Sequence, residues 1–148
     1  MSLSVIKEDI APYLLALLCV VVWLLFKTPF PKNPDALFGA TATVASVFAS
    51  FLGVSKALIL SIKETPTYKV LKKLNQTNRL FSFLKAGIWS AVVLAALSIL
   101  GFFISHEASV YKIPWFTIFA GFYIFSSALS LFLFGRVTNI FFKLLNQA

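Results

Sequence analysis

The chain has 148 residues, of which 59% are hydrophobic and only 12% are charged. Its mean hydropathy is +0.91, and it contains 17 Phe. The chain therefore has more apolar surface than one small domain can bury in its core. This composition excludes an ordinary water-soluble domain. It predicts instead a single all-α domain over residues 1–148 that is built from four transmembrane helices.

The net charge is +8, from 13 Lys+Arg against 5 Asp+Glu. In a soluble protein such an excess would favour a nucleic-acid partner, but here the basic residues cluster just outside the apolar stretches. That placement is typical of membrane topology and of contact with anionic lipids. We therefore expect a lipid bilayer, and no nucleic acid, as the direct partner.

The first apolar stretch, residues 10–26, is predicted to be a retained span and not a cleaved signal peptide. It follows Lys7, Glu8 and Asp9, which do not form a plainly positive segment, and no small-x-small cleavage site comes after it. The single cysteine, Cys19, lies inside this stretch, so the sequence offers neither a disulfide framework nor a cysteine metal cluster.

Pro29, Pro31 and Pro34 predict an extended connector after the first span, and the second span is predicted over residues 37–62. A basic segment follows, in which a short interfacial helix is expected to begin near Pro66. Its apolar positions fall on one side and its basic positions on the other. We expect the segment to bind lipid or an acidic partner through Lys69, Lys72, Lys73 and Arg79.

The third span is predicted over residues 80–105 and the fourth over residues 115–135, with a tail that keeps helical spacing. The connector between these spans contains Tyr111 and is followed by Trp115, which suits the aromatic belt at headgroup level. His106 and Glu107 are expected in this connector, as a solvated polar turn.

The topology follows from the positive-inside rule. With four crossings, ten of the thirteen basic residues fall on the side of the two termini and of the segment between the second and third spans. Only Lys27, Lys32 and Lys112 fall on the other side. The sequence therefore predicts a multi-pass protein of the cell inner membrane with both termini in the cytoplasm.

Small residues line nearly half of the circumference of the second span. They are Gly39, Ala42, Ala45, Ser46, Ala49, Ser50, Gly53 and Ala57. Because small side chains allow helices to approach closely in lipid, this small-residue arc is predicted to pack against another helix. One interpretation is a seam with the third span, which carries its own small residues. The other is an oligomer core or a pore lining.

Lys56 lies inside the small-residue arc and also has two interpretations. Its stem can extend to the cytoplasmic headgroups, which would make it a membrane anchor. Alternatively, copies of Lys56 in an oligomer would form a cationic ring near a pore mouth and favour anions.

No residue pattern indicates an enzyme. His106 is the only histidine, and none of the five acidic residues lies deep in a span, which also disfavours a proton-coupled exporter. The sequence shows no phosphate-binding loop and no metal-binding motif, so no cofactor and no metal are expected.

The overall plan and the second span, which opens with LFGAT at Leu37–Thr41, resemble the small four-span membrane proteins of phage exclusion, of the lambda Rex membrane-subunit type. This resemblance implies an antiviral membrane effector or sensor that works with a cytoplasmic protein partner and alters ion permeability. Two functions therefore remain. The first is a homo-oligomer whose second span lines a pore. The second is a closed membrane anchor or immunity-type subunit that binds a partner without conducting ions.

Overall fold

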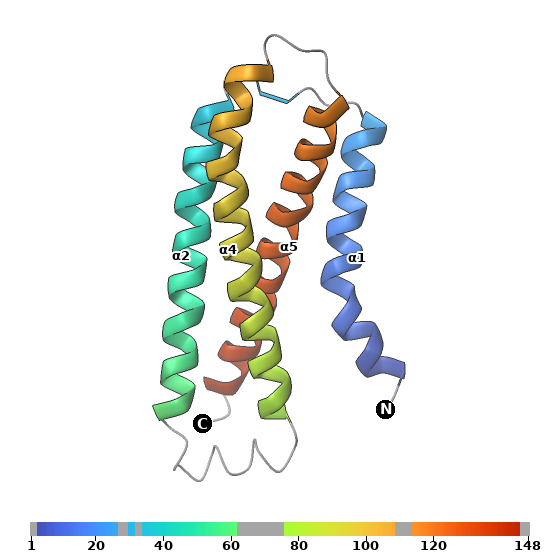
Figure 1. Cartoon of the computed structure of the whole chain (residues 1–148). Helices are drawn as coiled ribbons and strands as arrows, with labels where there is room; N and C mark the ends of the chain where they lie inside the picture. The colour runs from blue at the N-terminus through green and yellow to red at the C-terminus, as the bar shows by residue number, and fades with distance from the viewer. Residues whose placement is uncertain (1–2, 27–29, 32–33, 62–75, 109–113, 146–148) are drawn as a thin grey trace.

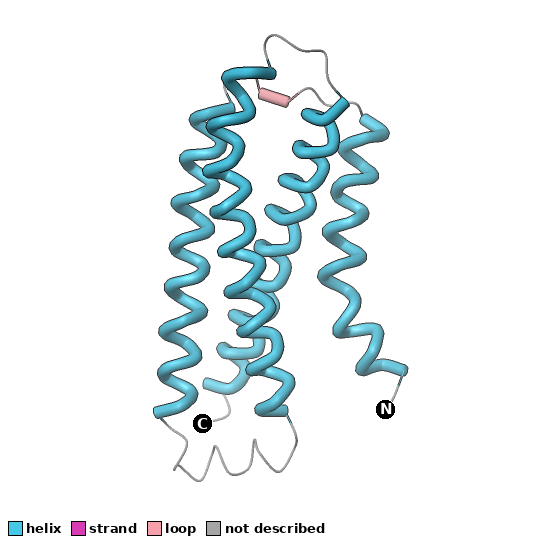
Figure 2. Tube along the Cα trace, viewed as in Figure 1, coloured by secondary structure: helices cyan, strands magenta, loops and turns pink. Residues whose placement is uncertain are grey.

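The computed structural model describes residues 3–26, 30–31, 34–61, 76–108 and 114–145. Nearly all of this described part is helical (Figures 1 and 2), which confirms the predicted all-α fold. The helices are α1 (Leu3–Phe26), α2 (Pro34–Ser61), α4 (Gln76–Ala108) and α5 (Pro114–Leu145).

Three helices are long and apolar enough to cross a membrane. The apolar stretches are Pro34–Ile59 in α2, Leu80–Ile104 in α4 and Thr117–Phe142 in α5. The apolar part of α1, Ile10–Phe26, is shorter. These three helices therefore fit a membrane protein, while a fourth crossing by α1 stays a prediction.

The helix boundaries differ from the predicted spans for local reasons. α2 already begins at Pro34, because the fixed φ of proline fits the first helical position. α4 continues to Ala108, so the backbone at His106 and Glu107 is helical and the expected polar turn there was wrong. α5 continues to Leu145, as the helical spacing of the tail indicated.

The predicted interfacial helix falls almost wholly on residues 62–75, which lie outside the described residues. Lys69, Lys72 and Lys73 belong to that range. Arg79 does not, because it lies in the first turns of α4.

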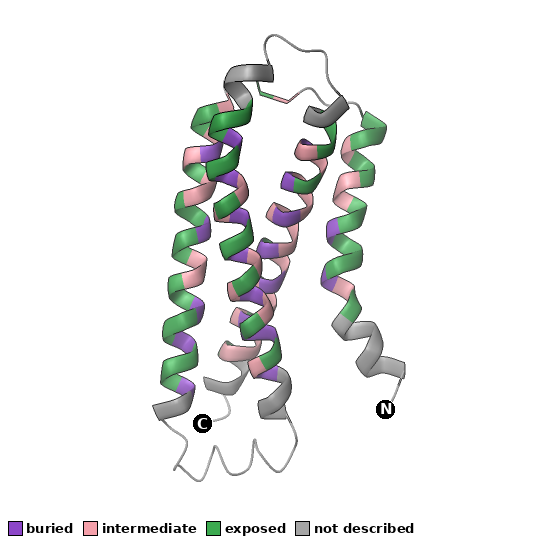
Figure 3. Cartoon of the chain, viewed as in Figure 1, coloured by how far each residue is buried: buried purple, intermediate pink, exposed green. Residues whose placement is uncertain are grey.

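α2, α4 and α5 form a three-helix core, and α1 packs on its edge. α4 contacts both α2 and α5, whereas α1 contacts only α5 among the described helices. Figure 1 shows α1 and α2 on opposite sides of the molecule, with α4 and α5 between them. The buried residues face this core, and most residues of α1 from Ile10 to Phe26 are exposed (Figure 3).

One half of the core is aliphatic. It is centred on Leu52 and Ile59 of α2, Leu84 of α4, and Leu133 and Val137 of α5. Leu52, Leu84, Leu133 and Val137 are each at most 1% exposed, so the three helices meet in a closely packed layer.

The other half is aromatic and surrounds Phe38, which is fully buried. Its ring meets Phe102, Phe119 and Tyr123 edge-on, at centroid distances of 6.0, 6.1 and 5.1 Å. Edge-to-face contacts of this kind are favoured by the quadrupoles of the rings. Gly101 of α4 lies directly under the Phe38 ring, because a Cβ added to it would be 2.7 Å from two ring atoms.

All four helices run roughly along one axis. The N-terminal ends of α1 and α4 and the C-terminal ends of α2 and α5 lie at the same end of the bundle (Figure 1). Lys56, Lys85 and Arg136 belong to this half of their helices. The geometry is therefore compatible with the predicted topology, in which this end faces the cytoplasm.

Candidate functional site

The face of α2 that packs into the core is marked by larger residues than the small-residue arc. Phe38, Ala45, Leu52 and Ile59, at every seventh position, are all buried, and Ser55 lies on the same face. A repeat of seven residues keeps one stripe facing a partner helix. Of these core-facing residues, only Ala45 also belongs to the small-residue arc.

The other residues of the small-residue arc lie progressively farther from the core. Gly39, Ala42 and Ala49 are half-buried at the edge of the contact with α4 and α5. Ser46, Ser50, Gly53 and Ala57 are exposed. The packing within the chain therefore uses one edge of the arc and leaves the other edge uncovered.

The uncovered edge forms a regular line of small side chains, here named the outer α2 stripe. It consists of Thr43, Ser46, Ser50, Gly53 and Ala57, all exposed and spaced alternately by three and four residues. A Cβ added to Gly53 would have no heavy atom within 4 Å. This spacing is the one that lets a second helix lie close along the first.

Two of the hydroxyl groups on this stripe are satisfied within their own helix. The Thr43 hydroxyl donates a hydrogen bond to the Gly39 carbonyl at 3.0 Å, and the Ser46 hydroxyl donates to the Ala42 carbonyl at 2.9 Å. Such bonds remove the need for a water partner. The oxygens still have lone pairs that can accept a second bond from water or from a neighbouring helix.

Lys56 is exposed and lies beside the outer α2 stripe, one helical turn after Gly53. It lies five residues before Ser61, where α2 ends, a distance of about 8 Å at the rise of an α-helix. A lysine side chain can span this distance to the headgroup level. The position therefore suits an anchor in one chain and a charged ring in an oligomer.

The small residues of α4 serve the core of the chain itself. Gly87, Ala91 and Ser98 are buried. A Cβ added to Gly87 would lie 2.9 Å from Leu52 Cδ1 and 3.9 Å from Leu133 Cβ, so this glycine lets α2 and α5 approach α4 together. Gly101 has the same function beneath Phe38, and the sequence analysis did not single it out.

The contact between α4 and α5 ends in a cation–π pair. The guanidinium carbon of Arg136 lies 4.4 Å from the centroid of the Phe83 ring, and Phe83 is 9% exposed. A cation–π pair is worth about 0.5 to 1 kcal/mol when exposed and about 2 kcal/mol when desolvated. Arg136 therefore ties α5 to α4 near the end that carries the other basic residues, while Lys85 is exposed.

Three side-chain hydroxyls of α5 are buried without a hydrogen-bond partner: those of Tyr123, Ser130 and Thr138. Tyr123 is 3% exposed and belongs to the aromatic half of the core. In contrast, the buried hydroxyls of Ser55 and Ser98 donate to Phe51 and Leu94 carbonyls of their own helices. In the part of the chain that the structure describes, these three α5 hydroxyls are the buried side-chain groups without a hydrogen-bond partner.

Comparison of the chain with protein-family models, with curated proteins and with solved structures finds no match. Within the described ranges, no group of three or more His, Cys, Asp and Glu residues is placed so that it could hold a metal ion. The outer α2 stripe with Lys56 is therefore the candidate site that the geometry itself defines.

Proposed function

We propose that the chain is an integral membrane protein with four crossings that self-associates through the outer α2 stripe and alters the permeability of the membrane. The observation that carries this proposal is the exposure of Ser46, Ser50, Gly53 and Ala57 in the folded chain. A pore-lining or oligomer-forming arc must not be filled by another helix of the same chain, and none of the described helices fills this edge.

The physical argument concerns what drives helices together in lipid. Hydrocarbon tails are as apolar as leucine, so association depends on close packing and on interhelical hydrogen bonds. A line of Gly, Ala and Ser permits that close approach, whereas the remaining exposed face of α2 carries Val47, Val54 and Leu58, which suit lipid contact. We therefore expect the small-residue side of α2 to contact another helix and the Val and Leu side to contact lipid.

In such an oligomer Lys56 would be repeated around the axis near the cytoplasmic end of α2. A ring of ammonium groups attracts anions and repels cations at a pore mouth. The hydroxyls of Thr43, Ser46 and Ser50 would lie along the same line, deeper in the membrane. The proposed role is therefore that of a small homo-oligomeric effector that acts with a cytoplasmic partner, in the manner of phage defence.

The first experiment separates association from folding. Gly53→Leu adds a side chain where the folded chain has open space, so the monomer should fold normally while the oligomer is weakened by about tenfold or more, equivalent to about 1.4 kcal/mol. Gly135→Leu is the matched control, because Gly135 of α5 also has no atom within 4 Å of an added Cβ. Oligomeric state is measured by cross-linking and sedimentation in detergent. Equal association of the two variants would contradict the proposed interface.

The second experiment tests conduction. Purified protein in liposomes should pass chloride more readily than potassium, Lys56→Gln should reduce that preference, and Lys56→Glu should reverse it. Lys85→Gln is the control, since Lys85 is an exposed lysine of α4 and not of α2. Absence of ion flux from folded, oligomeric protein, with and without its cytoplasmic partner, would refute the permeability function.

The alternative is a closed anchor or immunity-type subunit that offers the stripe to a partner protein instead of to its own copies. It is favoured by the hydrogen bonds of Thr43 and Ser46 within α2, which leave these hydroxyls without need of a water-filled lumen. The two functions differ in one result. An anchor would keep Gly53→Leu monomeric like the parent chain, but would lose its partner.

A further inference from the structure

The basic side chains that the structure describes lie at one height of the bundle. They are Lys56 of α2, Lys85 of α4 and Arg136 of α5. The guanidinium carbon of Arg136 lies over the ring of Phe83, two residues before Lys85, so α4 and α5 carry their cations at the same level. The packing of α2 on α4 brings Lys56 to this level as well.

The contact between α2 and α4 places Lys56 and Lys85 opposite each other. The two helices are antiparallel (Figure 1), and a Cβ added to Gly39 would lie 3.8 Å from Phe102 Cζ. Lys56 comes 17 residues after Gly39 and Lys85 comes 17 residues before Phe102, so equal steps along the two helices lead from this contact to the lysines. Seventeen residues are close to five helical turns. Both lysines therefore return to the same outer side of the seam between α2 and α4, where both are exposed.

The height of these cations corresponds to the edge of the hydrocarbon core of a membrane. Ile104, where the apolar stretch of α4 ends, lies 19 residues after Lys85. Thr117, where the apolar stretch of α5 begins, lies 19 residues before Arg136. At the rise of an α-helix both distances are about 28 Å, close to the thickness of roughly 30 Å of a hydrocarbon core. The cations are therefore at headgroup level when Ile104 and Thr117 lie at the opposite surface.

No acidic residue of the three core helices balances the charge of the two lysines. Asp35 lies in the first turn of α2 and Glu107 lies near the end of α4, both at the opposite end of the bundle, and α5 has no acidic residue. Two like charges that face each other across a seam repel, and an anion bound between them removes this repulsion. The seam therefore offers a place for an anion at headgroup level.

We propose that Lys56 and Lys85 together bind the phosphate group of an anionic lipid at the cytoplasmic surface of the membrane. Each ammonium group has three N–H donors for the phosphate oxygens, and these charge-assisted bonds are stronger than neutral ones. Val92 and Ile99 follow Lys85 at every seventh position of α4 and are exposed, so the acyl chains of the same lipid would meet an apolar surface directly beside the lysines. The proposal rests on the membrane location given above, but not on self-association or conduction.

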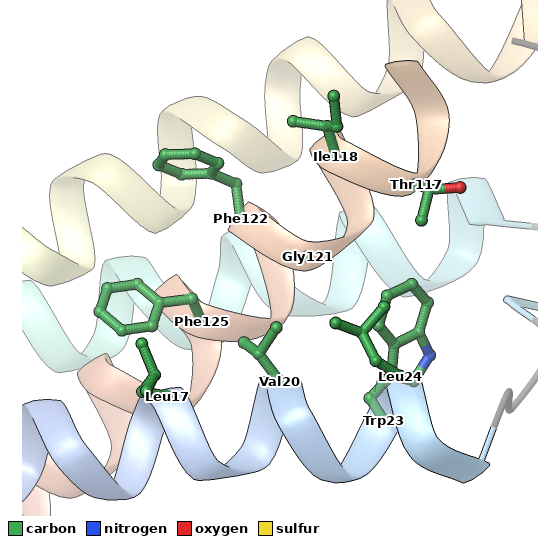
Figure 4. Close-up of a pocket in the computed structure, with 9 residues that line it drawn as sticks. All are labelled: Leu17, Val20, Trp23, Leu24, Thr117, Ile118, Gly121, Phe122 and Phe125. Atoms are coloured by element: carbon green, nitrogen blue, oxygen red, sulfur yellow. The ribbon is translucent and has the colours of Figure 1, made fainter. Parts of the chain in front are cut away.

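The groove between α1 and α5 contrasts with this site. Its nine lining residues include Val20 and Phe122, and none of the nine is charged (Figure 4). A lipid phosphate therefore has no cation to bind in this groove. Lys7 of α1 belongs to the same end of the bundle as Lys56 but to another helix, so Lys7→Gln removes one charge without changing the proposed site.

The first test measures lipid retained by the detergent-purified full chain in native mass spectrometry. The probe is dioleoylphosphatidylglycerol, and dioleoylphosphatidylcholine is the comparison without net charge. The parent protein should bind phosphatidylglycerol in preference to phosphatidylcholine. Lys56→Gln and Lys85→Gln should each weaken this binding by about fivefold, the usual contribution of one basic residue near an anionic membrane surface, and the double variant by about 25-fold. Lys7→Gln should bind the lipid as the parent does.

The second test measures whether the two positions are close in space. In a Cys19→Ala chain, the pair Lys56→Cys and Lys85→Cys should be bridged within one chain by a short bismaleimide, which mass spectrometry detects as a single reagent joined to both cysteines. The pair Lys56→Cys and Arg136→Cys is the control. It should not be bridged, because Arg136 lies on Phe83, on the α5 side of α4.

Several outcomes would overturn the proposal: equal binding of the two lipids by the parent, equal binding of phosphatidylglycerol by the parent and the double variant, or no bridge between positions 56 and 85 in folded protein. Displacement of the lipid by an equal concentration of soluble glycerophosphate would show that the lysines bind a free phosphate and not a lipid. The ion-flux control Lys85→Gln is run in vesicles of neutral lipid, where the lysines have no anionic lipid to bind. Association of Gly53→Leu involves neither lysine, so the two proposals fail separately.

Discussion

Gly101→Ala is the substitution for which the structure makes the sharpest prediction. The added Cβ would lie 2.7 to 2.8 Å from three atoms of the Phe38 ring, about 0.7 Å short of the 3.4 Å at which ordinary contact begins. The ring cannot move aside at no cost, because Phe102, Phe119 and Tyr123 surround it edge-on and it is fully buried. We expect the free energy of unfolding to fall by about 1 to 3 kcal/mol, the usual cost of overpacking a core.

The assay is unfolding of the detergent-solubilised protein by a denaturing detergent, followed by circular dichroism. Gly135→Ala is the control, since its Cβ meets open space and Ala favours a helix over Gly by about 0.5 to 1 kcal/mol. In a Phe38→Leu background Gly101→Ala should cost less, with a coupling energy of about 1 to 2 kcal/mol between the two sites. Equal stability of the two Gly→Ala variants, or strictly additive effects with Phe38→Leu, would refute the proposed contact.

Other predictions follow from single contacts and from the topology. Tyr123→Phe should leave the free energy of unfolding unchanged or raised, because the hydroxyl is buried without a partner; a loss above about 1 kcal/mol would show that it is paired in the membrane. Arg136→Gln should lower that free energy by about 0.5 to 2 kcal/mol in the same assay, and by less when Phe83 is Leu. In intact cells an impermeant thiol reagent should label Ser109→Cys and not Thr77→Cys. Labelling of Thr77→Cys would reverse the orientation.

The helices were predictable because apolar runs of this length have few other uses. Hydropathy and proline placement located both ends of α2 and of α4 and the start of α5 to within four residues, while the fourth span was predicted to end ten residues before the end of α5. The ends were less predictable: α4 extends past His106 to Ala108 although this part of the sequence is polar. Once a helix has formed, adding one more residue is easy even where that residue has a low helix propensity, so propensity alone does not locate the end of α4.

The small-residue arc could be found in the sequence, but its orientation could not. Whether a small side chain faces a neighbour depends on which other helix supplies the large side chain opposite. The core face was better indicated by the large residues Phe38, Leu52 and Ile59, which belong to a seven-residue repeat that also includes Ala45. Ala16 illustrates the same point, because it is fully buried on α1 although its neighbours Leu15 and Leu17 are exposed.

Glycines in this chain have different functions that only their surroundings distinguish. Gly87 and Gly101 of α4 allow side chains of α2 to approach, while Gly53 and Gly135 face open space. Gly101 lies between large apolar residues, so sequence alone gave no reason to separate it from a tolerated glycine. Its importance comes from Phe38, a residue more than sixty positions earlier that reaches it only in the folded bundle.

The placement of the two outer helices constrains any assembly. α1 and α2 lie on opposite sides of the molecule with α4 and α5 between them (Figure 1), and among the described helices they do not contact each other. Copies that associate through α2 would therefore place α1 at the periphery of the assembly. This arrangement assigns close helix packing to the side rich in Ser, Gly and Ala, and acyl chains to the side rich in Leu and Phe. Association through α1 would reverse that assignment and bury bulky side chains at the axis, which the packing of helices in lipid disfavours.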